Sequence, residues 1–509
     1  MKYGFVIDQD RCIGCHACTV ACKEEHNVPL GVFRTWVKYI EKGEFPNVSR
    51  HFGVMRCNHC DDAPCVEICP TRSLYRRADG IVDFDPRRCI GCKSCMQACP
   101  YDALYIDPYS DTAAKCNFCA HRVELDLEPS CVIVCPTQAI IAGDLDDPAS
   151  LPSRIIASGK VASRKPHKGT NPKLFYVGID GALLDPLSAR EGSTHMWGSR
   201  NPAGTRAQLP IDRDVPAAGA ARVAYDVAHP APWGWKIAAY LFTKSVAAGV
   251  LLVAALMLTL GYRGDVGILG FAAPLLALTF TLVTAGLLIV DLKRPDRFYF
   301  LLTKPNPRSW VVIGAWILIA YGAVTFVWFA IGLSSGLPPP FVVFAAALLS
   351  IAAACYTGFL FAQARGRDLW QSSIFTWHLL TQAAIAGAAI LIIGGVFTGV
   401  AAETQFALCN TLAVSLVISL LMILGELSLT SSSQDVRAAI SLLVCGALRL
   451  QFLGGVLGVG ILLPILLLAV AGRVDSPATW QCTAALIAMA GIWIFDSLWV
   501  TAGQAVPLS

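Results

Sequence analysis

Cysteine is concentrated at the start of this chain of 509 residues, which contains 20 cysteines in all. Sixteen of them fall within the first 135 residues, in four groups of four. Closely spaced thiolates are ligands for zinc or for iron–sulfur clusters. The four groups are Cys12, Cys15, Cys18 and Cys22; Cys57, Cys60, Cys65 and Cys69; Cys89, Cys92, Cys95 and Cys99; and Cys116, Cys119, Cys131 and Cys135.

Two of these groups, in the segments CIGCHACTVAC and CIGCKSCMQACP, have the spacing of bacterial ferredoxins. In that spacing three thiolates hold one iron–sulfur cube and the fourth binds a neighbouring cube. The other two groups have a longer middle interval, which inserts a loop without removing a ligand. Gly14 and Gly91 give the backbone conformational freedom where it must wrap a cube. We therefore predict four [4Fe–4S] clusters bound by all sixteen cysteines.

Disulfides and zinc are the two other common uses of clustered cysteines. A disulfide framework needs an oxidising compartment, but the segment MKYGFVIDQD at the start shows neither an export signal nor a twin-arginine pair. Zinc ribbons use two pairs of thiolates, whereas the ferredoxin-type groups place three thiolates within seven residues. The spacing therefore favours iron–sulfur clusters over both alternatives.

The second half of the chain is strongly apolar. The whole chain is 55% hydrophobic with a mean hydropathy of +0.55, and a series of apolar stretches begins near residue 233. A stretch of about 18 or more apolar residues can cross a bilayer as a helix. Several tryptophans stand near the starts of these stretches, as interfacial aromatics do. The eight predicted spans are 236–260, 271–291, 310–333, 341–362, 374–396, 406–428, 452–471 and 480–502.

Basic residues in the short loops predict the orientation of these spans. The loops after even-numbered spans share one side of the membrane with the cysteine-rich half and carry nine lysines and arginines between residues 293 and 449. The opposite side carries only Arg263 and Arg473. The positive-inside rule then places the cysteine-rich half in the cytoplasm. Residues 181–232 are expected to be a solvated linker, and the net charge of +4 requires no nucleic acid partner.

Titratable side chains occur inside several predicted spans, where a charge is costly, and this makes them functional candidates. Lys244, Asp291, His378, Glu426 and Asp496 all fall in the half of the bilayer nearer the cysteine-rich half. A quinone site needs hydrogen-bonding groups for two carbonyl oxygens, an apolar slot and proton carriers. The candidates for such a pocket are Tyr240, Lys244, Asp291, Arg294, Tyr356, His378 and Glu426.

Each candidate also has a structural interpretation. His378 or Glu426 could serve as an interhelical hydrogen-bond partner, and Lys244 could pair with Asp291 or Glu426 for stability alone. The gathering of all these groups on one side of the membrane favours the functional interpretation.

Longer segments of both halves resemble known families. The segments RCNHCDDAPCVEICPT, CIGCKSCMQACPYDALYIDP and KCNFCAHR resemble the four-cluster subunit of molybdopterin oxidoreductases, as in polysulfide, tetrathionate and dimethyl sulfoxide reductases. The segments DLKRPDRFYFLLTKPNPRSW and CYTGFLFAQARGRDLW resemble the NrfD-like, quinone-reacting membrane anchor. The two parts are usually separate chains, so this chain looks like a fusion of them.

The resemblance implies a fold and a set of cluster ligands. Residues 1–180 should form an α+β ferredoxin-like iron–sulfur domain of two di-cluster modules. Residues 233–509 should form an all-α membrane domain of eight transmembrane helices. Each group of cysteines should also exchange its last member with another group. Cys135 then joins the first three cysteines of group one, Cys22 those of group four, Cys99 those of group two, and Cys69 those of group three.

The resemblance also implies a function, that of a non-catalytic electron-transfer subunit of an oxidoreductase with its own site for quinone oxidation or reduction. Four clusters would relay electrons between a separate catalytic subunit, holding a molybdenum or tungsten pterin, and menaquinone or ubiquinone. The location would be the inner membrane of a bacterium or archaeon. Two alternatives stay open, namely a redox-driven proton-translocating module and a membrane anchor whose clusters serve a soluble partner.

Overall fold

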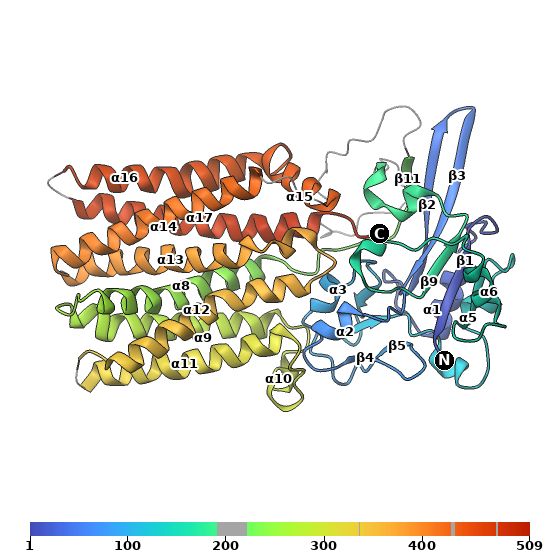
Figure 1. Ribbon diagram of the computed structural model, residues 1–509, viewed down its shortest axis with the longest axis horizontal. Helices are drawn as coiled ribbons and strands as arrows, with labels where there is room; N and C mark the ends of the chain where they lie inside the picture. Colours follow the sequence, from blue (N-terminus) through green and yellow to red (C-terminus); the bar gives the residue numbers. More distant parts are fainter. Residues whose placement is uncertain (191–220, 335, 429–432, 475–476) are drawn as a thin grey trace.

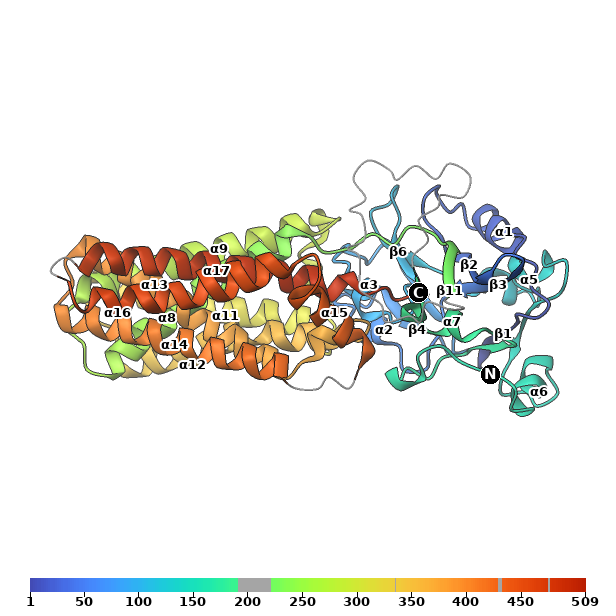
Figure 2. The ribbon, with the colours of Figure 1, turned by 90° about the horizontal axis from the view of Figure 1, so that it is seen from above.

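The computed structural model describes residues 1–190, 221–334, 336–428, 433–474 and 477–509. Two views at right angles show an elongated molecule with a bundle of long helices at one end (Figures 1 and 2). The cysteine-rich half, made of small strands and short helices, lies at the other end. The predicted division into an α+β part followed by an all-helical part is confirmed.

Two sheets organise the cysteine-rich half. In the first, β1 (Tyr3–Asp8) lies between β8 (Ile140–Asp144), to which it is antiparallel, and β9 (Leu174–Val177), to which it is parallel. In the second, the long hairpin β2 (Thr35–Glu44) and β3 (Asn47–Arg56) is the main component. The first sheet is held by its buried central strand, in which Phe5, Val6 and Ile7 are almost fully enclosed.

Short elements hold the cysteine loops between these sheets. Two small hairpins and several helices of about one or two turns follow the cysteine groups along the chain. These elements are α1 (Ala17–Glu25), α2 (Pro64–Ile68), β4 (Leu74–Arg76), β5 (Val82–Phe84), α3 (Ser94–Ala98), β6 (Leu104–Ile106), β7 (Ala113–Lys115), α4 (Ala120–Val123), α5 (Ser130–Ile133), α6 (Leu151–Ala157) and η1 (Pro166–Lys168).

The predicted linker, residues 181–232, contributes to the second sheet. It contains α7 (Gly181–Leu184), η2 (Pro186–Ser188), β10 (Ala189–Arg190) and β11 (Ala221–Tyr225). Strand β11 pairs antiparallel with β2, and β10 pairs with β11. The ends of the predicted linker are therefore part of the folded cysteine-rich half, whereas its residues 191–220 lie outside the described residues.

Eight helices of the described residues are long and apolar enough to cross a membrane, which confirms the predicted number. Their bounds agree with the predicted spans to within a few residues, because a run of apolar side chains fixes the length of a spanning helix. The spans are Trp235–Thr259, Gly267–Asp291, Trp310–Ser334, Pro340–Gln363, Ile374–Thr398, Ala402–Ser428, Leu450–Ala471 and Pro477–Ala505.

Most of these spans are single helices, and two begin with a wider helical segment. The single helices are α8 (Trp235–Thr259), α11 (Trp310–Ser334), α12 (Pro340–Gln363), α13 (Ile374–Thr398), α14 (Ala402–Ser428) and α17 (Pro477–Ala505). The composite spans are η3 (Gly267–Ala272) with α9 (Ala273–Asp291) and η6 (Leu450–Leu462) with α16 (Leu463–Ala471). The connecting elements are η4 (Pro295–Arg297), α10 (Phe300–Thr303), η5 (Asp368–Gln371) and α15 (Gln434–Val444).

Helix α8 lies at the centre of the bundle and crosses α13 closely. Gly249 of α8 and Gly387 of α13 meet at this crossing, where a Cβ on Gly249 would overlap the backbone oxygen of Ala383. Small residues allow such an approach of two helices in a membrane. The apolar side chains of α8 are accordingly among the most buried in the protein.

The loops at one end of the bundle dock directly on the cysteine-rich half. Asn306 donates a hydrogen bond to the Cys69 carbonyl at 2.9 Å, and Ser309 donates one to the Ile68 carbonyl at 2.6 Å. Arg297 donates to the Cys89 carbonyl at 3.0 Å, and the buried Arg367 donates to the Gln97 side chain at 2.9 Å. Basic residues counted above for membrane orientation therefore also hold the two halves together.

Candidate functional site

The sixteen clustered cysteines come together in four sets, each drawn from two of the sequence groups. One small enclosed cavity is lined by Cys57, Cys60, Cys65 and Cys99, which we call set C. A second is lined by Cys69, Cys89, Cys92 and Cys95, which we call set D. Each set contains the first three cysteines of one sequence group and the last cysteine of another: Cys99 joins set C and Cys69 joins set D. The family resemblance implies this exchange.

The remaining eight cysteines lie farther from the helical bundle and form two further sets. Cys12 interacts with Cys15 and Cys135, and Cys22 interacts with Cys116 and Cys131. We call set A the cysteines Cys12, Cys15, Cys18 and Cys135, and set B the cysteines Cys22, Cys116, Cys119 and Cys131. This grouping again matches the exchange of last cysteines implied by the resemblance.

The geometry of these sets fits a cluster better than a single ion or a disulfide. All twenty cysteines are free thiols. Within the described residues, no three metal-ligating side chains lie close enough to hold one metal ion. Four thiols spaced around an enclosed cavity suit the corners of an iron–sulfur cube, whereas zinc requires four ligands that converge on one point.

Loops with left-handed backbone geometry carry the thiols of sets A and D. Gly14 and His16 have φ values of 70° and 61°, and Gly91 and Lys93 repeat this pattern with 69° and 64°. Backbone N–H groups consequently turn toward the sulfur atoms, as from Gly91 to Cys89 Sγ at 3.4 Å. Such hydrogen bonds stabilise thiolate charge and help to set the potential of a bound cluster.

Two buried cations lie between the sets and offset the negative charge of thiolates. Arg56, fully buried, donates to Cys131 Sγ at 3.2 Å and stands 4.5 Å from the centre of the Phe5 ring. Burial raises the pKa of the Cys131 thiol, and Arg56 opposes this rise. Lys115 is equally buried and interacts with Cys57. A buried charge is tolerated only beside a partner of opposite sign, so these cations suit anionic clusters.

Neighbouring sets lie within electrostatic range of one another and form a continuous series. Cys18 of set A interacts with Cys131 of set B, and Cys57 of set C interacts with Cys116 of set B. Cys95 of set D interacts with Cys65 of set C. The order A, B, C, D therefore runs from the far end of the cysteine-rich half to the helical bundle.

Set D adjoins a cavity between the two halves that we call the membrane cavity. Its volume is about 110 Å³, and its wall is mostly apolar. Helices α8, α9, α11 and α12 form its sides, and the loop that carries set D closes one end. The lining residues are Ile90, Cys92, Ser94, Trp233, Ile237, Tyr240, Leu288, Ile289, Asp291, Leu292, Phe298, Leu301, Val311, Ala315, Tyr356, Leu360 and Phe361.

Three of the seven predicted pocket residues line this cavity. The hydroxyls of Tyr240 and Tyr356 hydrogen-bond to each other, and Tyr240 also contacts the Thr357 hydroxyl at 2.7 Å. Asp291 pairs with Lys93, between Cys92 and Ser94 of the set D loop, at 2.8 Å. The cavity thus combines an apolar slot with hydroxyl and carboxylate groups next to a cysteine of set D, and the ammonium group of Lys93 pairs with that carboxylate.

The other four candidates lie elsewhere. Arg294 pairs with Asp296 at 2.9 Å, outside the cavity wall. Lys244 lies behind Tyr356, where its Nζ donates to the Ala354 carbonyl at 2.6 Å, so it pairs with neither Asp291 nor Glu426. His378 and Glu426 pair with each other at 3.3 Å. Two further residues of this region were not predicted, namely Trp233 in the cavity wall and Lys93 as the partner of Asp291. The sequence signals that could have indicated them are a tryptophan at the start of a predicted span and a lysine inside the segment CIGCKSC.

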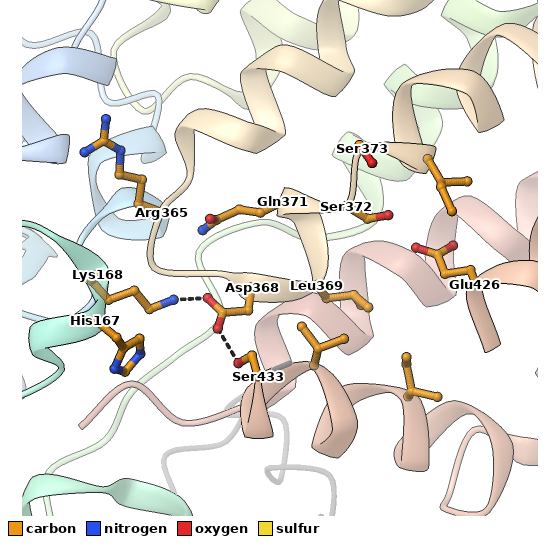
Figure 3. Close-up of a pocket in the computed structure, with 13 residues that line it drawn as sticks. His167, Lys168, Arg365, Asp368, Leu369, Gln371, Ser372, Ser373, Glu426 and Ser433 are labelled. Atoms are coloured by element: carbon orange, nitrogen blue, oxygen red, sulfur yellow. Dashed lines mark hydrogen bonds and ion pairs between the residues drawn. The ribbon is translucent and has the colours of Figure 1, made fainter. Parts of the chain in front are cut away.

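A second cavity, which we call the polar cavity, has a volume of about 540 Å³ and lies near the junction of the two halves (Figure 3). His167 and Lys168 come from the cysteine-rich half, while Asp368 and Glu426 come from the helical half. Asp368 pairs with Lys168 and accepts a hydrogen bond from the Ser433 hydroxyl at 2.5 Å. Glu426 points into this cavity from the end of α14.

A buried charge cluster closes the junction on another side. His229 contacts Asp102 at 2.5 Å and Asp226 at 3.4 Å, and Lys38 contacts Asp226 at 3.1 Å. Burial alone would lower the pKa of His229, but Asp102 and Asp226 outweigh it and raise this pKa to about 10. His229 is therefore charged at neutral pH and joins the segment before α8 to the cysteine-rich half.

This cluster predicts a loss of stability at alkaline pH. The pKa of His229 is raised on folding, so its contribution is complete below about pH 6.5 and is lost as the pH rises toward 10. His229→Gln should lower the free energy of unfolding at pH 7 by roughly 3 kcal/mol, because two buried carboxylates lose a partner. Thermal unfolding of both proteins at pH 7 and pH 10 measures this. If the wild type and His229→Gln lose the same amount of stability between pH 7 and pH 10, the raised pKa of His229 would be contradicted.

Comparison with known proteins agrees with this structure. The family described as "Polysulphide reductase, NrfD" matches residues 225–507, a "4Fe-4S dicluster domain" matches residues 48–145, and a "4Fe-4S binding domain" matches residues 3–24. The chain therefore belongs to the NrfD family and carries 4Fe–4S ferredoxin domains before its membrane part. It is a fusion of an iron–sulfur subunit with an NrfD-like multi-pass membrane part.

Curated relatives match about a third of the chain. The B subunit of tetrathionate reductase from Salmonella typhimurium is 44% identical over 193 residues, which cover 37% of this chain and 77% of that protein. Protein NrfC of Escherichia coli is 44% identical over 180 residues, covering 35% and 81%. The arsenate respiratory reductase iron–sulfur subunit ArrB of Shewanella sp. is 35% identical over 227 residues, covering 35% and 96%. The fusion thus resembles the electron-transfer subunits of reductase complexes.

Proposed function

We propose that this chain carries electrons between a separate catalytic subunit and a quinone in the membrane. In this proposal sets A to D each hold one [4Fe–4S] cluster, so that all sixteen clustered cysteines are ligands. The membrane cavity binds the head group of menaquinone or ubiquinone. The observation that carries the proposal is the continuity of the four sets with this cavity, into which Cys92 of set D opens.

The chemistry of the membrane cavity suits a quinone. Its apolar wall accepts an isoprenoid chain, while the hydroxyls of Tyr240 and Tyr356 can donate hydrogen bonds to a carbonyl oxygen. The Lys93–Asp291 pair brings a cation and a carboxylate to the edge nearest set D. A few polar groups inside a mostly apolar pocket are the usual arrangement of a small-molecule site.

The opposite end of the cluster series supports docking of a partner. Cys15 of set A is exposed, and apolar side chains surround the loops that carry sets A and B. Ile13, Val20 and Ile133 are each more than half exposed, and α1 packs against α5. Exposed apolar groups of this kind mark protein interaction surfaces. We propose that the partner is a molybdopterin subunit with molybdenum or tungsten, as the relatives' membership of reductases suggests.

The proposed location is the inner membrane of a bacterium or archaeon, with the iron–sulfur domain in the cytoplasm. The excess of lysines and arginines in the loops next to the iron–sulfur domain supports the cytoplasmic side. In the same proposal residues 1–180 with strand β11 form the iron–sulfur domain, and residues 233–509 form the membrane domain.

Substitution in the membrane cavity tests the quinone site. Asp291→Asn and Tyr356→Phe should each slow oxidation of a soluble quinol analogue by roughly a hundredfold, since each removes a group that handles protons or hydrogen bonds at the reacting oxygen. Quinol-driven cluster reduction, followed by optical absorbance, measures this. Tyr321→Phe is the matched control, because Tyr321 is buried in α11 but donates to the Ala247 carbonyl outside the cavity. Normal rates in both cavity variants would refute the assignment of the cavity.

A further inference from the structure

The polar cavity and the membrane cavity are separated by a row of buried titratable side chains. The row begins at Glu426, which lines the polar cavity and has 14% of its side chain exposed. Its Oε2 lies 3.3 Å from Nε2 of His378, which is only 1% exposed, and at this distance the two groups form an ion pair without hydrogen-bond geometry. A carboxylate at a polar cavity wall next to a buried imidazole can pass a proton from solvent to the protein interior.

The row continues through α13 and α17. Gln382 lies one helical turn after His378 on α13, so both side chains are on the same face. Asp496 of α17 is fully buried, and Gln382 and Lys244 interact with its carboxylate, although neither carboxylate oxygen meets the geometry of a direct hydrogen bond. The Gln382 side-chain oxygen is also unpartnered. Buried polar atoms without partners are rare unless ordered water or a transferable proton serves them.

The row ends at the membrane cavity. Lys244 interacts with Asp496 on one side, and on the other its Nζ lies 5.3 Å from the centre of the Tyr356 ring. Tyr356 shares a hydrogen bond with Tyr240, and both tyrosines line the membrane cavity. The titratable side chains Glu426, His378, Asp496, Lys244 and Tyr356 can each hold or relay a proton, and the Gln382 amide between His378 and Asp496 is a hydrogen-bonding group.

We infer that protons exchanged with the quinone travel between the polar cavity and the membrane cavity along Glu426, His378, Asp496, Lys244 and Tyr356. This inference rests on the proposed function of the membrane cavity. Reduction of one quinone to quinol takes two electrons, one from each of two reduced clusters, and two protons. Oxidation of quinol reverses both transfers. The route supplies or removes the two protons in either direction.

The position of the route determines which side of the membrane exchanges protons. The polar cavity lies at the end of the bundle that contacts the iron–sulfur half, and His167 and Lys168 of that half help to form it. Electrons and protons thus reach the quinone from the same side. Quinone turnover should therefore move no net charge across the membrane, unlike the proton-translocating alternative.

A purely structural pair of Glu426 and His378 would not account for these features. Such a pair requires neither a polar cavity at Glu426 nor, farther along the row, a buried carboxylate that lacks a direct hydrogen bond. A buried carboxylate whose oxygens make no direct hydrogen bond costs stability, so its presence here favours a role in proton transfer.

Glu426→Gln in the full-length chain, reconstituted in liposomes, tests the route. After reduction with dithionite and removal of the excess reductant, the variant should reduce decylubiquinone, the probe, roughly ten- to a hundredfold more slowly than the wild type. Its solvent deuterium isotope effect should increase, and a small permeant weak acid should restore part of the rate. Glu426→Asp should retain most activity. Glu403→Gln is the matched control, because Glu403 is exposed at the other end of the same helix.

The outcomes separate this inference from the proposed function. A wild-type rate and isotope effect in Glu426→Gln would overturn the route while leaving the quinone site intact. If Glu426→Gln fails to assemble, Asp496→Asn is measured in the same way, and wild-type behaviour there also overturns the route. A wild type with intact clusters that cannot reduce decylubiquinone would refute the proposed function and the route with it. Proton uptake from the liposome side opposite the iron–sulfur domain would also contradict the route.

Discussion

Cys65→Ser should interrupt the cluster series and abolish reduction of quinone by electrons that enter at set A. Cys65 lines the set C cavity and is the cysteine of that set that interacts with Cys95 of set D. Serine is a poor ligand for iron, so the protein should retain about twelve irons rather than about sixteen. Sets A and B would keep their clusters but lose their neighbour toward the membrane. This variant has the largest expected effect on function, because each cluster in a linear series is indispensable.

Iron analysis and low-temperature paramagnetic resonance of the reduced protein measure the loss, and mixing with decylubiquinone measures the transfer. Cys445→Ser is the matched control, since Cys445 is an exposed cysteine outside the four sets. The control should retain full iron content and full rate. Reoxidation of sets A and B by quinone at the wild-type rate in Cys65→Ser would contradict a series order of A, B, C, D.

Gly249→Leu should destabilise the membrane domain strongly. The new side chain would collide with the backbone of α13 at Ala383 and Gly387, and backbone cannot yield as a flexible side chain can. Overpacking of a core costs about 1–3 kcal/mol even where side chains adjust, so this change should exceed about 3 kcal/mol. Thermal unfolding in detergent, followed by loss of helical circular dichroism, measures the effect.

Gly286→Leu provides the comparison for this prediction. Gly286 is also a glycine inside a spanning helix, but nothing lies within 4 Å of a Cβ built on it. The control should unfold at nearly the wild-type temperature. A similar temperature for Gly249→Leu would mean that α8 and α13 do not approach as closely as the structure describes.

Much of the fold could be predicted from local sequence. Hydropathy alone indicates the number and approximate limits of the spanning helices, because each span must be long and apolar by itself. The left-handed geometry of Gly14 and Gly91 also follows from the short spacing of the thiolates around them. These features depend on residues that are close together along the chain, so they can be predicted from a short segment of sequence.

Features that depend on docking of the two halves were harder to predict. Lys244 was one possible partner of Asp291 in the structural interpretation, yet Asp291 pairs with Lys93 of the set D loop. Strand β11 joins β2 across a separation of more than 170 residues, and the predicted linker therefore contributes to the sheet. His378 and Glu426 were grouped with the quinone candidates because they share a depth, but they lie outside the membrane cavity. The depth of a residue along a spanning helix can be predicted by counting residues in the sequence. The residue of another helix or loop that lies beside it at that depth cannot be predicted in this way.

The basic loops show how one pattern can have two physical causes. Arg297 and Arg367 contribute to the charge bias from which a cytoplasmic side was predicted. Both also donate hydrogen bonds to the iron–sulfur half, and Arg367 is buried there. Positive charge in these loops therefore serves docking whichever side the domain occupies.

The central claim is that one polypeptide connects an exposed thiolate cluster to a quinone in the bilayer. The most direct measurement is a single turnover of the anaerobically purified full-length protein in liposomes, reduced with dithionite, freed of the excess reductant and then mixed with decylubiquinone. The account predicts that the signals of all four clusters disappear together and that one quinol forms for every two electrons lost. Clusters that stay reduced with decylubiquinone, yet are oxidised at once by ferricyanide added to the medium, would contradict it.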